Sequence, residues 1–300
     1  MTVFHNSVLL KESVNALHVS PDGIYVDVTF GGGGHSKLIL DKIQNGKVVA
    51  FDQDKETLKN TINNDKRFIM INKNFRFLKE ELALLGVFEI DGLIADLGVS
   101  AYHFTNNNRG FSLKYDSVLD MRMDTSSKKD GLFVVNKYDQ KNLARIFKQY
   151  ADFNNPNFIV DAIVSARSRK IIKTTFDLKS TLKHYVSYKN QNQFFARIFQ
   201  AIRIEVNDEI CALKELLKQA LDILNPKGRL VVISYHSTED KLVKSFMKFG
   251  NFLNTPNQDF FGNITKPFKQ ITKKPIVPSL DEVNSNNKAR SAKMRVCEKI

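Results

Sequence analysis

The chain has 300 residues, of which 42% are hydrophobic and 26% are charged, and these values exclude a disordered or fibrous protein. Its two cysteines are too few for a disulfide scaffold or a cysteine-built zinc site, and the lack of a long apolar run or a secretory signal indicates a cytoplasmic protein without a membrane span. The net charge of +13 favours an anionic partner, either nucleic acid or a membrane surface, unless it reflects a lysine-rich genome.

Short β-rich runs alternate with helical segments through the first hundred residues. The predicted strands are Ile24–Phe30, Lys47–Asp52, Arg67–Asn72 and Ile90–Leu97. Helices are expected in the segments between them, at Ser36–Ile43, Lys55–Ile62 and Phe75–Leu85. This alternation is typical of an α/β fold with a parallel sheet and right-handed crossovers. Two later runs extend the same sheet, Gly228–Ser234 and Lys293–Glu298.

A helical insertion is predicted between the fourth and fifth strands, because this gap is too long for one crossover. Residues 105–200 hold only two glycines, and their apolar residues recur at helical spacing. We therefore expect an inserted helical substrate-recognition domain at 105–200 and a split sheet domain at 1–104 and 201–300. Residues 251–288 carry four of the seven prolines, which predicts a long mobile loop.

A glycine run follows the first predicted strand and opens the next helix, in the sequence Asp27-Val-Thr-Phe-Gly-Gly-Gly-Gly-His35-Ser36. Glycine permits positive φ and lets the backbone approach a ligand closely, as it does in nucleotide-binding sheets. The spacing departs from G-x-G-x-x-G, since Ser36 takes the place of the third glycine. This departure argues against a dinucleotide site.

Acidic residues end two strands of the predicted sheet. Asp52 follows Gly34 by 18 residues, where a carboxylate can accept hydrogen bonds from ribose hydroxyls or, alternatively, cap the segment that starts at Asp54. Asp96 ends the fourth strand near the switch point of the sheet. Ligands bind beyond the carboxyl ends of parallel strands. Together these features predict a pocket for S-adenosylmethionine, with Phe75 beside the adenine.

Longer motifs occur in order over nearly the whole chain, among them PDGIYVDVTFGGGGHS, IDGLIADLGVS, LDMRMD, FQAIRIEVN, SYHSTED and KARSAKMRV. With them the chain resembles the RsmH (MraW) family of S-adenosylmethionine-dependent methyltransferases. The resemblance implies a Rossmann-like class I methyltransferase sheet with an inserted helical domain. It implies methylation of the exocyclic N4 of a specific cytidine in the decoding (P-site) region of 16S ribosomal RNA, within the small ribosomal subunit. The implied cofactor contacts are Gly33, Gly34, His35, Asp52, Phe75, Asp96 and His103.

The predicted reaction is an in-line displacement, which depends on positioning the amine and excluding water. The cytosine N4 lone pair is delocalised into the ring, so a hydrogen-bond acceptor near N4–H would favour attack. We expect Asp96, or the backbone carbonyl after it, to be this acceptor. No metal is required, and no HExxH motif or Cys/His cluster indicates one.

Three residues of the insertion are candidates for holding the RNA. Phe111 could stack on the target base once the base leaves its helix, or it could pack in a core. Arg109 and Arg122 could bind phosphates, or they could be ordinary solvated charges.

Four further candidates for substrate binding lie in the second half of the chain. Gln200, Arg203 and Asn207 are spaced i, i+3 and i+7 on the polar face of one predicted helix. We expect this face to point at the cleft between cofactor and substrate, although an ordinary solvated face is the alternative. His236 follows the fifth strand and is expected at the same edge of the sheet.

Two other classes of function stay open at this point. The first is a nicotinamide-dependent oxidoreductase, against which the glycine spacing, the positive charge and the helical insertion argue. The second is a non-catalytic RNA-binding or ribosome-assembly factor with a degenerate methyltransferase sheet. The intact set of Gly33, Asp52 and Asp96 argues against such decay.

Overall fold

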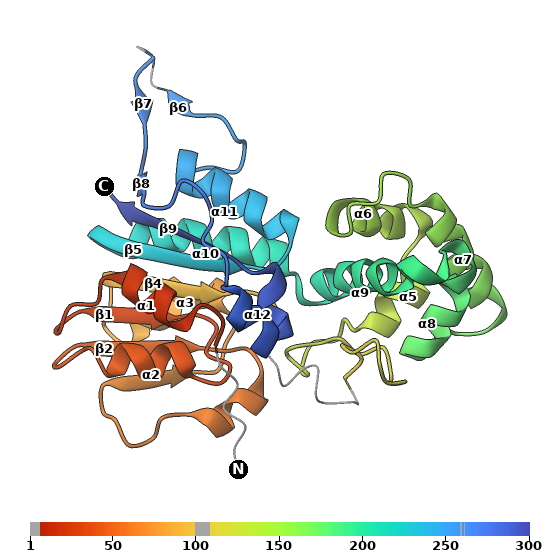
Figure 1. Cartoon of the computed structure of the whole chain (residues 1–300), viewed down its shortest axis with the longest axis horizontal. Coiled ribbons are helices and arrows are strands. Elements are labelled where there is room, and N and C mark those ends of the chain that lie inside the picture. The colour runs from red at the N-terminus through yellow and green to blue at the C-terminus, as the bar shows by residue number, and fades with distance from the viewer. Residues whose placement is uncertain (1–6, 100–108, 259, 261) are drawn as a thin grey trace. The chain divides into compact units, whose positions relative to one another are not determined.

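The computed structural model describes residues 7–99, 109–258, 260 and 262–300, and it divides into two compact units (Figure 1). The sheet unit comprises Met1–Gly98 and Cys211–Ile300, and the helical unit comprises Val99–Ile210. These boundaries differ from the predicted ones at 104 and 200. The predicted boundary at 200 falls inside helix α9, Gln191–Asn207, whose apolar residues belong to the core of the helical unit.

A seven-stranded sheet with the order β3-β2-β1-β4-β5-β9-β8 forms the centre of the sheet unit. Its strands are β1 Ile24–Asp27, β2 Lys47–Phe51, β3 Phe68–Ile71, β4 Ile90–Asp96, β5 Leu224–Ser234, β8 Phe268–Gln270 and β9 Lys293–Lys299. The strands β1 to β5 are parallel, while β9 and β8 pair antiparallel beyond β5. The order reverses between β1 and β4, as in doubly wound nucleotide-binding sheets. The predicted class I methyltransferase fold is therefore confirmed.

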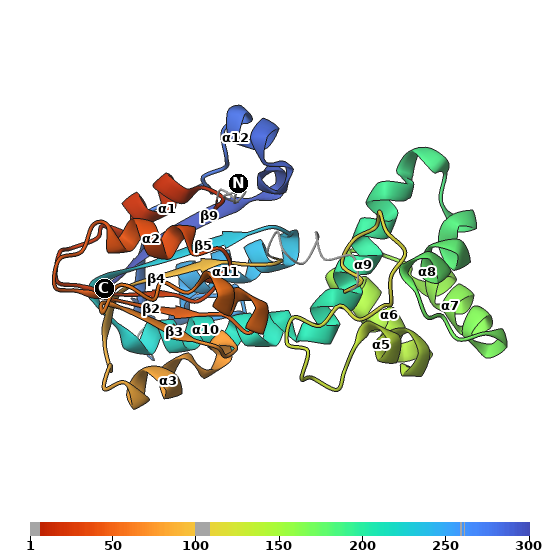
Figure 2. The same ribbon diagram turned by 90° about the horizontal axis from the view of Figure 1, so that it is seen from below.

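Helices cover both faces of this sheet (Figure 2). The helices α1 (Leu10–Leu17) and α2 (Gly34–Leu40) pack on one face, and α3 (Leu78–Leu84), α10 (Glu209–Ile223) and α11 (Ser237–Phe249) contribute to the apolar layer on the other. Side chains alternate between the two layers, so that in β4 Ile94 faces α1 and α2 while Leu93 faces the opposite layer. Burial on both faces explains why the parallel strands are continuous apolar runs in the sequence.

The stretch 251–288, predicted to be a long mobile loop, is not a loop throughout. This stretch contains the short strands β6 (Asn257–Gln258) and β7 (Ile264–Thr265), the strand β8 and the helix α12 (Leu280–Ser285), and a 3-10 turn, Asn287–Ser291, follows. Phe268 of β8 is buried against Phe246 of α11. Phe252 stacks on the same Phe246 ring, and β8 pairs with β9, so apolar contacts and backbone pairing hold this segment on the sheet. Residues Lys55–Asn60, expected in an α-helix, form a 3-10 helix.

The helical unit has a separate apolar core. It contains α5 (Gly131–Lys137), α6 (Gln140–Tyr150), α7 (Asn157–Arg169), α8 (Thr175–Leu182) and α9. In α6, Leu143, Ile146 and Phe147 recur at helical spacing and are fully buried. A capping box between Thr174 and Asp177 starts α8. Among the helices that the structure describes, none combines the length and the apolar character needed to cross a membrane.

Candidate functional site

Three acids lie at the carboxyl ends of parallel strands in the sheet unit, Asp27 fully buried and Asp52 and Asp96 half-buried. Asp27 ends β1, Asp52 directly follows β2, and Asp96 ends β4. Burial raises the pKa of Asp27 to about 6, of Asp52 to about 7 and of Asp96 to about 6. The charge of Asp27 raises the pKa of the other two further, which shows that the three groups share one electrostatic environment. A cation bound among them would stabilise their ionised forms.

The glycine run leaves β1 at the same edge and requires glycine at its third position. Gly33 has φ +76°, and its N–H donates to the carbonyl of Phe30 at 2.7 Å. A Cβ at this position would lie 2.8 Å from the Phe30 ring. Gly34 is the first residue of α2. The neighbouring Gly32 is exposed, and a Cβ there would meet nothing within 4 Å, so the backbone of the turn is open to a ligand on this side.

Asp52 fastens this glycine turn to the end of β2. Its Oδ2 accepts a hydrogen bond from the N–H of Gly31 at 2.9 Å, and its Oδ1 accepts one from the N–H of Asp54 at 2.9 Å. The side chain that caps the following 3-10 helix is that of Asp54, which accepts from the N–H of Glu56. Each oxygen of Asp52 has a second lone pair, so the carboxylate can still accept from the hydroxyls of a ligand.

Asp96 is held at both its backbone and its side chain. Its N–H donates to Thr29 Oγ1 at 2.6 Å, and its Oδ1 accepts from the hydroxyl of Tyr235 at 2.7 Å. Within the part of the chain that the structure describes, Oδ2 of Asp96 accepts no hydrogen bond. One oxygen is therefore fixed by the protein while the other can serve a ligand.

Two basic side chains act electrostatically on Asp96. His35 is 3% exposed, and this burial lowers its pKa. The negative charge of Asp96 raises the pKa of His35 by a smaller amount. Burial likewise lowers the pKa of Lys288 to about 8, again opposed by Asp96. Burial thus favours the neutral form of His35, while Lys288 keeps most of its charge at pH 7.

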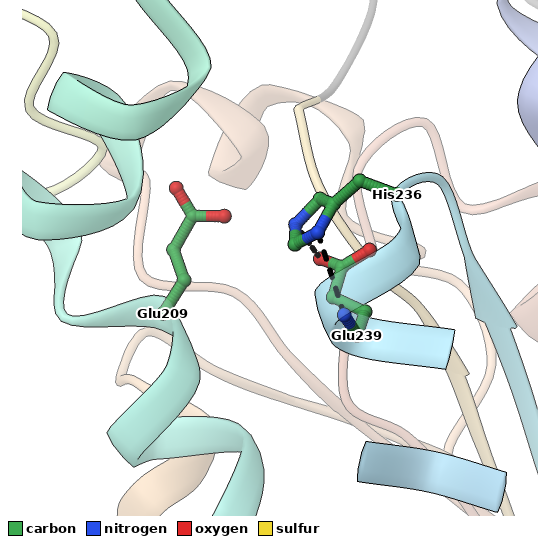
Figure 3. A group of neighbouring side chains, drawn as sticks. All are labelled: Glu209, His236 and Glu239. Atoms are coloured by element: carbon green, nitrogen blue, oxygen red, sulfur yellow. Dashed lines mark hydrogen bonds and ion pairs between the residues drawn. The ribbon is translucent and has the colours of Figure 1, made fainter. Parts of the chain in front are cut away.

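His236 lies after β5 and pairs with an acid of the next helix (Figure 3). His236 is the N-cap of α11, and its Nδ1 accepts from the N–H of Glu239 at 3.4 Å. Its Nε2 lies 3.1 Å from Glu239 Oε1, while Glu239 Oε2 accepts from the N–H of Tyr235 at 2.9 Å. Glu239 thus orients the turn that carries both Tyr235 and His236. The expected contact between His236 and substrate stays a prediction.

Phe75 follows β3 at the same edge of the sheet. It begins a short 3-10 turn, Phe75–Phe77, and packs partly buried against the apolar core. The side chain of Asn72 donates to the carbonyl of Asp52 at 2.8 Å, which ties the end of β3 to the end of β2. The place of Phe75 beside an adenine stays a prediction, and His103 lies outside the described residues.

The three residues at the start of the insertion that were candidates for binding RNA make contacts within the helical unit instead. Arg109 is buried and donates to the carbonyls of Arg122 and Met123 at 2.5 and 2.9 Å. Arg122 forms a two-pronged ion pair with Asp120 at 2.6 and 3.0 Å. Phe111 is 6% exposed and belongs to the apolar core. These contacts stabilise the segment itself, and they leave Phe111 no free ring face for a base.

The polar face of α9 is present, but its side chains bind within the helical unit. Gln200 donates to the carbonyl of Tyr150 at 2.9 Å, and Arg203 pairs with Glu209 at 2.8 and 2.9 Å. Asn207 donates to the carbonyl of Met121 and accepts from the N–H of Met123. This face therefore joins α9 to the end of α6, to Glu209 and to the segment around Met121, roles that the spacing alone did not indicate.

The sequence did not single out several residues that complete the edge of the sheet, namely Asp27, Thr29, Tyr235, Glu239 and Lys288. Asp27 is the last residue of β1, as Asp96 is of β4, but it lies inside the predicted strand Ile24–Phe30, which hid its place at the strand end. Tyr235 and Glu239 lie within the SYHSTED motif. Nothing local to Lys288 pointed to a position near Asp96.

Comparisons with known proteins place the chain among methylases. The model of the MraW methylase family matches residues 2–300. The chain is 51% identical to the ribosomal RNA small subunit methyltransferase H of Flavobacterium johnsoniae, over 99% of this chain and 98% of that protein. It is 49% identical to the protein of the same name from Christiangramia forsetii, with the same coverage. A solved rRNA methylase from Streptococcus thermophilus is 12% identical over 96% of this chain and 95% of that one, with a TM-score of 0.45.

Proposed function

Because this chain belongs to the MraW methylase family, we propose that it transfers a methyl group from S-adenosylmethionine to the exocyclic N4 of a cytidine in the decoding (P-site) region of 16S ribosomal RNA. Family membership confirms the resemblance found in the sequence, and with it that the chain is an S-adenosylmethionine-dependent methyltransferase. The name of its relatives supports small-subunit RNA as substrate. Such an activity would act on the small ribosomal subunit in the cytoplasm.

The observation that carries this proposal is the set of three carboxyls, one buried and two half-buried, beside the glycine turn. A bound S-adenosylmethionine supplies a methyl group on a positively charged sulfur. Asp27, Asp52 and Asp96 all have pKa values raised by burial, so a cationic ligand relieves an unfavourable environment that the protein otherwise bears. The exposed backbone around Gly32 allows close approach, and Asp52 can accept from ribose hydroxyls. These residues fit the cofactor.

Asp96 is proposed to act on the amine. Its Oδ2 would accept the hydrogen bond of N4–H, which localises the nitrogen lone pair as the amine attacks. The carbon–sulfur bond breaks as the carbon–nitrogen bond forms, and a proton leaves N4 afterwards. With a pKa of about 6, Asp96 is mostly ionised at pH 7.5 and is close enough to neutrality to take that proton. Tyr235 acts as a positioning residue that fixes the carboxylate through Oδ1.

Membership of a methylase family leaves no support for a nicotinamide-dependent oxidoreductase. A non-catalytic assembly factor would have no need to gather three carboxyls with raised pKa values at one edge of the sheet. We therefore keep the methyltransferase as the one proposed function.

The test is transfer of radiolabelled methyl groups to small ribosomal subunits that lack the modification, and in parallel to the naked 16S RNA. We expect label on N4 of one cytidine, located by mass spectrometry, and loss of at least a hundredfold in kcat for Asp96→Asn. Label on a ring carbon or on a ribose hydroxyl would refute the N4 assignment. Turnover of Asp96→Asn at the wild-type rate would remove Asp96 from the reaction.

A further inference from the structure

A basic and aromatic surface lies between α8 and α9 in the helical unit. Two 3-10 turns, Lys183–Tyr185 and Tyr188–Asn190, connect α8 to α9. Leu182 before them is buried, and Val186 between them packs on the apolar core. The exposed side chains around these anchors include two lysines and two tyrosines, which we call the α8–α9 surface: Lys183, Tyr185, Tyr188 and Lys189.

The charge of this surface is one-sided. Acidic residues make up 32 of the 300 residues, so a stretch of 27 would hold about three. Residues 178–204 contain none, although they contain three lysines and two arginines. Neither Lys183 nor Lys189 has an ion pair within the described ranges. An ordinary solvated face mixes both signs of charge, whereas this one presents cations alone.

The aromatic residues of the surface are exposed in a way that folding does not explain. Tyr188 is 91% exposed, and in the part of the chain that the structure covers its ring has no aromatic contact and its hydroxyl no hydrogen bond. Tyr185 is 50% exposed, while its ring is held against Phe158 with the centroids 5.7 Å apart. Burial of an aromatic ring normally contributes to stability, so a ring left in water points to a partner.

From these observations we propose that the α8–α9 surface binds single-stranded RNA. Lys183 and Lys189 can bind backbone phosphates through their positive charges. The rings of Tyr185 and Tyr188, three residues apart, can stack on unpaired bases, an interaction that depends little on base sequence. The inference rests on the proposed function, because it assigns this surface to an unpaired segment of the RNA substrate. It concerns residues distinct from those that face the methyl group.

The test measures the affinity of the full chain for a fluorescein-labelled single-stranded RNA 12-mer by anisotropy, over a range of salt concentrations. The double variant Lys183→Glu, Lys189→Glu should weaken binding at least tenfold and reduce the slope of log Kd against log salt by about 1.4, since each phosphate contact on a single strand contributes about 0.7. The matched control is Lys141→Glu, Lys148→Glu, which reverses two exposed lysines of α6 in the same unit. Equal losses in both variants would mean that only net charge matters and would overturn the proposal.

The second variant separates stacking from charge. Tyr188→Ala should lower the affinity for the single-stranded RNA about tenfold, while the affinity for a duplex of the same sequence stays within twofold of wild type. Tyr188 is exposed, so the temperature of thermal unfolding should be unchanged. Wild-type affinity in Tyr188→Ala, or binding of the surface to phosphatidylserine vesicles in place of RNA, would overturn the proposal.

Failure of this inference is distinguishable from failure of the proposed function. If the chain methylates small subunits and the α8–α9 variants do so as well as the α6 control, the surface assignment fails alone. If no RNA is methylated but the α8–α9 variants still bind single-stranded RNA more weakly than wild type, the RNA-binding surface is supported and the proposed reaction fails.

Discussion

The hydroxyl of Tyr235 donates a 2.7 Å hydrogen bond to Oδ1 of Asp96, and this bond joins the residue after β5 to the last residue of β4. Burial raises the pKa of Tyr235, so the hydroxyl keeps its proton and remains a donor. The bond lowers the pKa of Asp96 against the larger effect of burial, which raises it to about 6. Tyr235 therefore contributes to keeping Asp96 ionised near neutral pH.

Replacing Tyr235 by phenylalanine should shift the pH dependence of the reaction. Tyr235→Phe removes a donor to the charged form of Asp96, so the pKa of Asp96 rises and the acid limb of kcat moves to higher pH. We expect about a tenfold loss of kcat at pH 6.5 and a smaller loss at pH 8.5, with the Kd for S-adenosylmethionine within a few-fold of wild type. The measurement is kcat from pH 5.5 to 9.

A purely structural role for Tyr235 predicts a different result. In that case kcat would fall by the same factor at every pH, and the acid limb would not move. Asp96→Asn provides the reference, because an amide does not titrate and its residual activity should show no acid limb at all.

The affinity for S-adenosylmethionine should increase with pH. Asp52 and Asp96 have pKa values of about 7 and about 6, so both gain negative charge between pH 5.5 and 7.5. A cationic sulfur binds better to the ionised carboxyls, and we expect Kd to fall about tenfold over this interval. Isothermal titration calorimetry at several pH values would measure it.

S-adenosylhomocysteine is the control for this pH effect, because its sulfur is uncharged. Its Kd should depend on pH less steeply than that of S-adenosylmethionine. Parallel pH profiles for the two ligands would contradict the idea that these carboxyls recognise the positive charge.

Without ligand, Asp27 should make the protein less stable as the pH rises. Its folded-state pKa of about 6 lies above the ordinary value of 3.8, so the folded protein binds the proton more tightly and loses stability as the pH rises from about 4 through 6. Asp27→Asn removes the charge and keeps a partner for Ser36, whose hydroxyl donates to Asp27 at 2.7 Å. As the pH rises from 5 to 8, we expect the unfolding free energy of the variant to increase by about 1–3 kcal/mol relative to that of wild type.

Urea unfolding at the two pH values measures this difference, with Asp65→Asn as the control. Asp65 is paired with the adjacent Arg67, and hydrogen bonds from Arg67 lower its pKa to about 2. Asp65 is ionised at both pH values in the folded and unfolded states. In Asp65→Asn the unfolding free energy should therefore change between pH 5 and pH 8 by the same amount as in wild type. A wild-type pH slope in Asp27→Asn would show that Asp27 is not the source.

The position of the site was predictable because of how parallel strands are arranged. Apolar runs reveal the strands of a sheet buried on both faces, and the carboxyl ends of those strands share one edge. Residues such as Asp52 and Asp96, which end such runs, are thereby brought to one place without knowledge of any contact. The same logic applies to the glycine turn, whose conformation is local.

The partners of polar side chains were not predictable from spacing. In the sequence, Arg203 and Arg109 cannot be told apart from arginines that bind RNA. In the structure Arg203 pairs with Glu209, and Arg109 donates to backbone carbonyls. Tyr235 and Asp96 are separated by 139 residues, and only the sheet order brings them together. A sequence pattern indicates which face of a helix is polar, but which group lies opposite depends on the packed structure.

The last prediction concerns Gly33, for which the chain offers a matched control. Gly33→Ala and Gly86→Ala both place alanine at a positive φ, +76° and +71°, so the backbone strain is similar. Only at Gly33 would the new Cβ meet a ring, that of Phe30 at 2.8 Å, whereas at Gly86 nothing lies within 4 Å. We expect Gly86→Ala to cost about 1 kcal/mol in unfolding free energy and Gly33→Ala to cost more, with a loss of at least tenfold in S-adenosylmethionine affinity. Calorimetry and urea unfolding of both variants would measure the two effects, and equal affinities would show that the turn does not approach the cofactor.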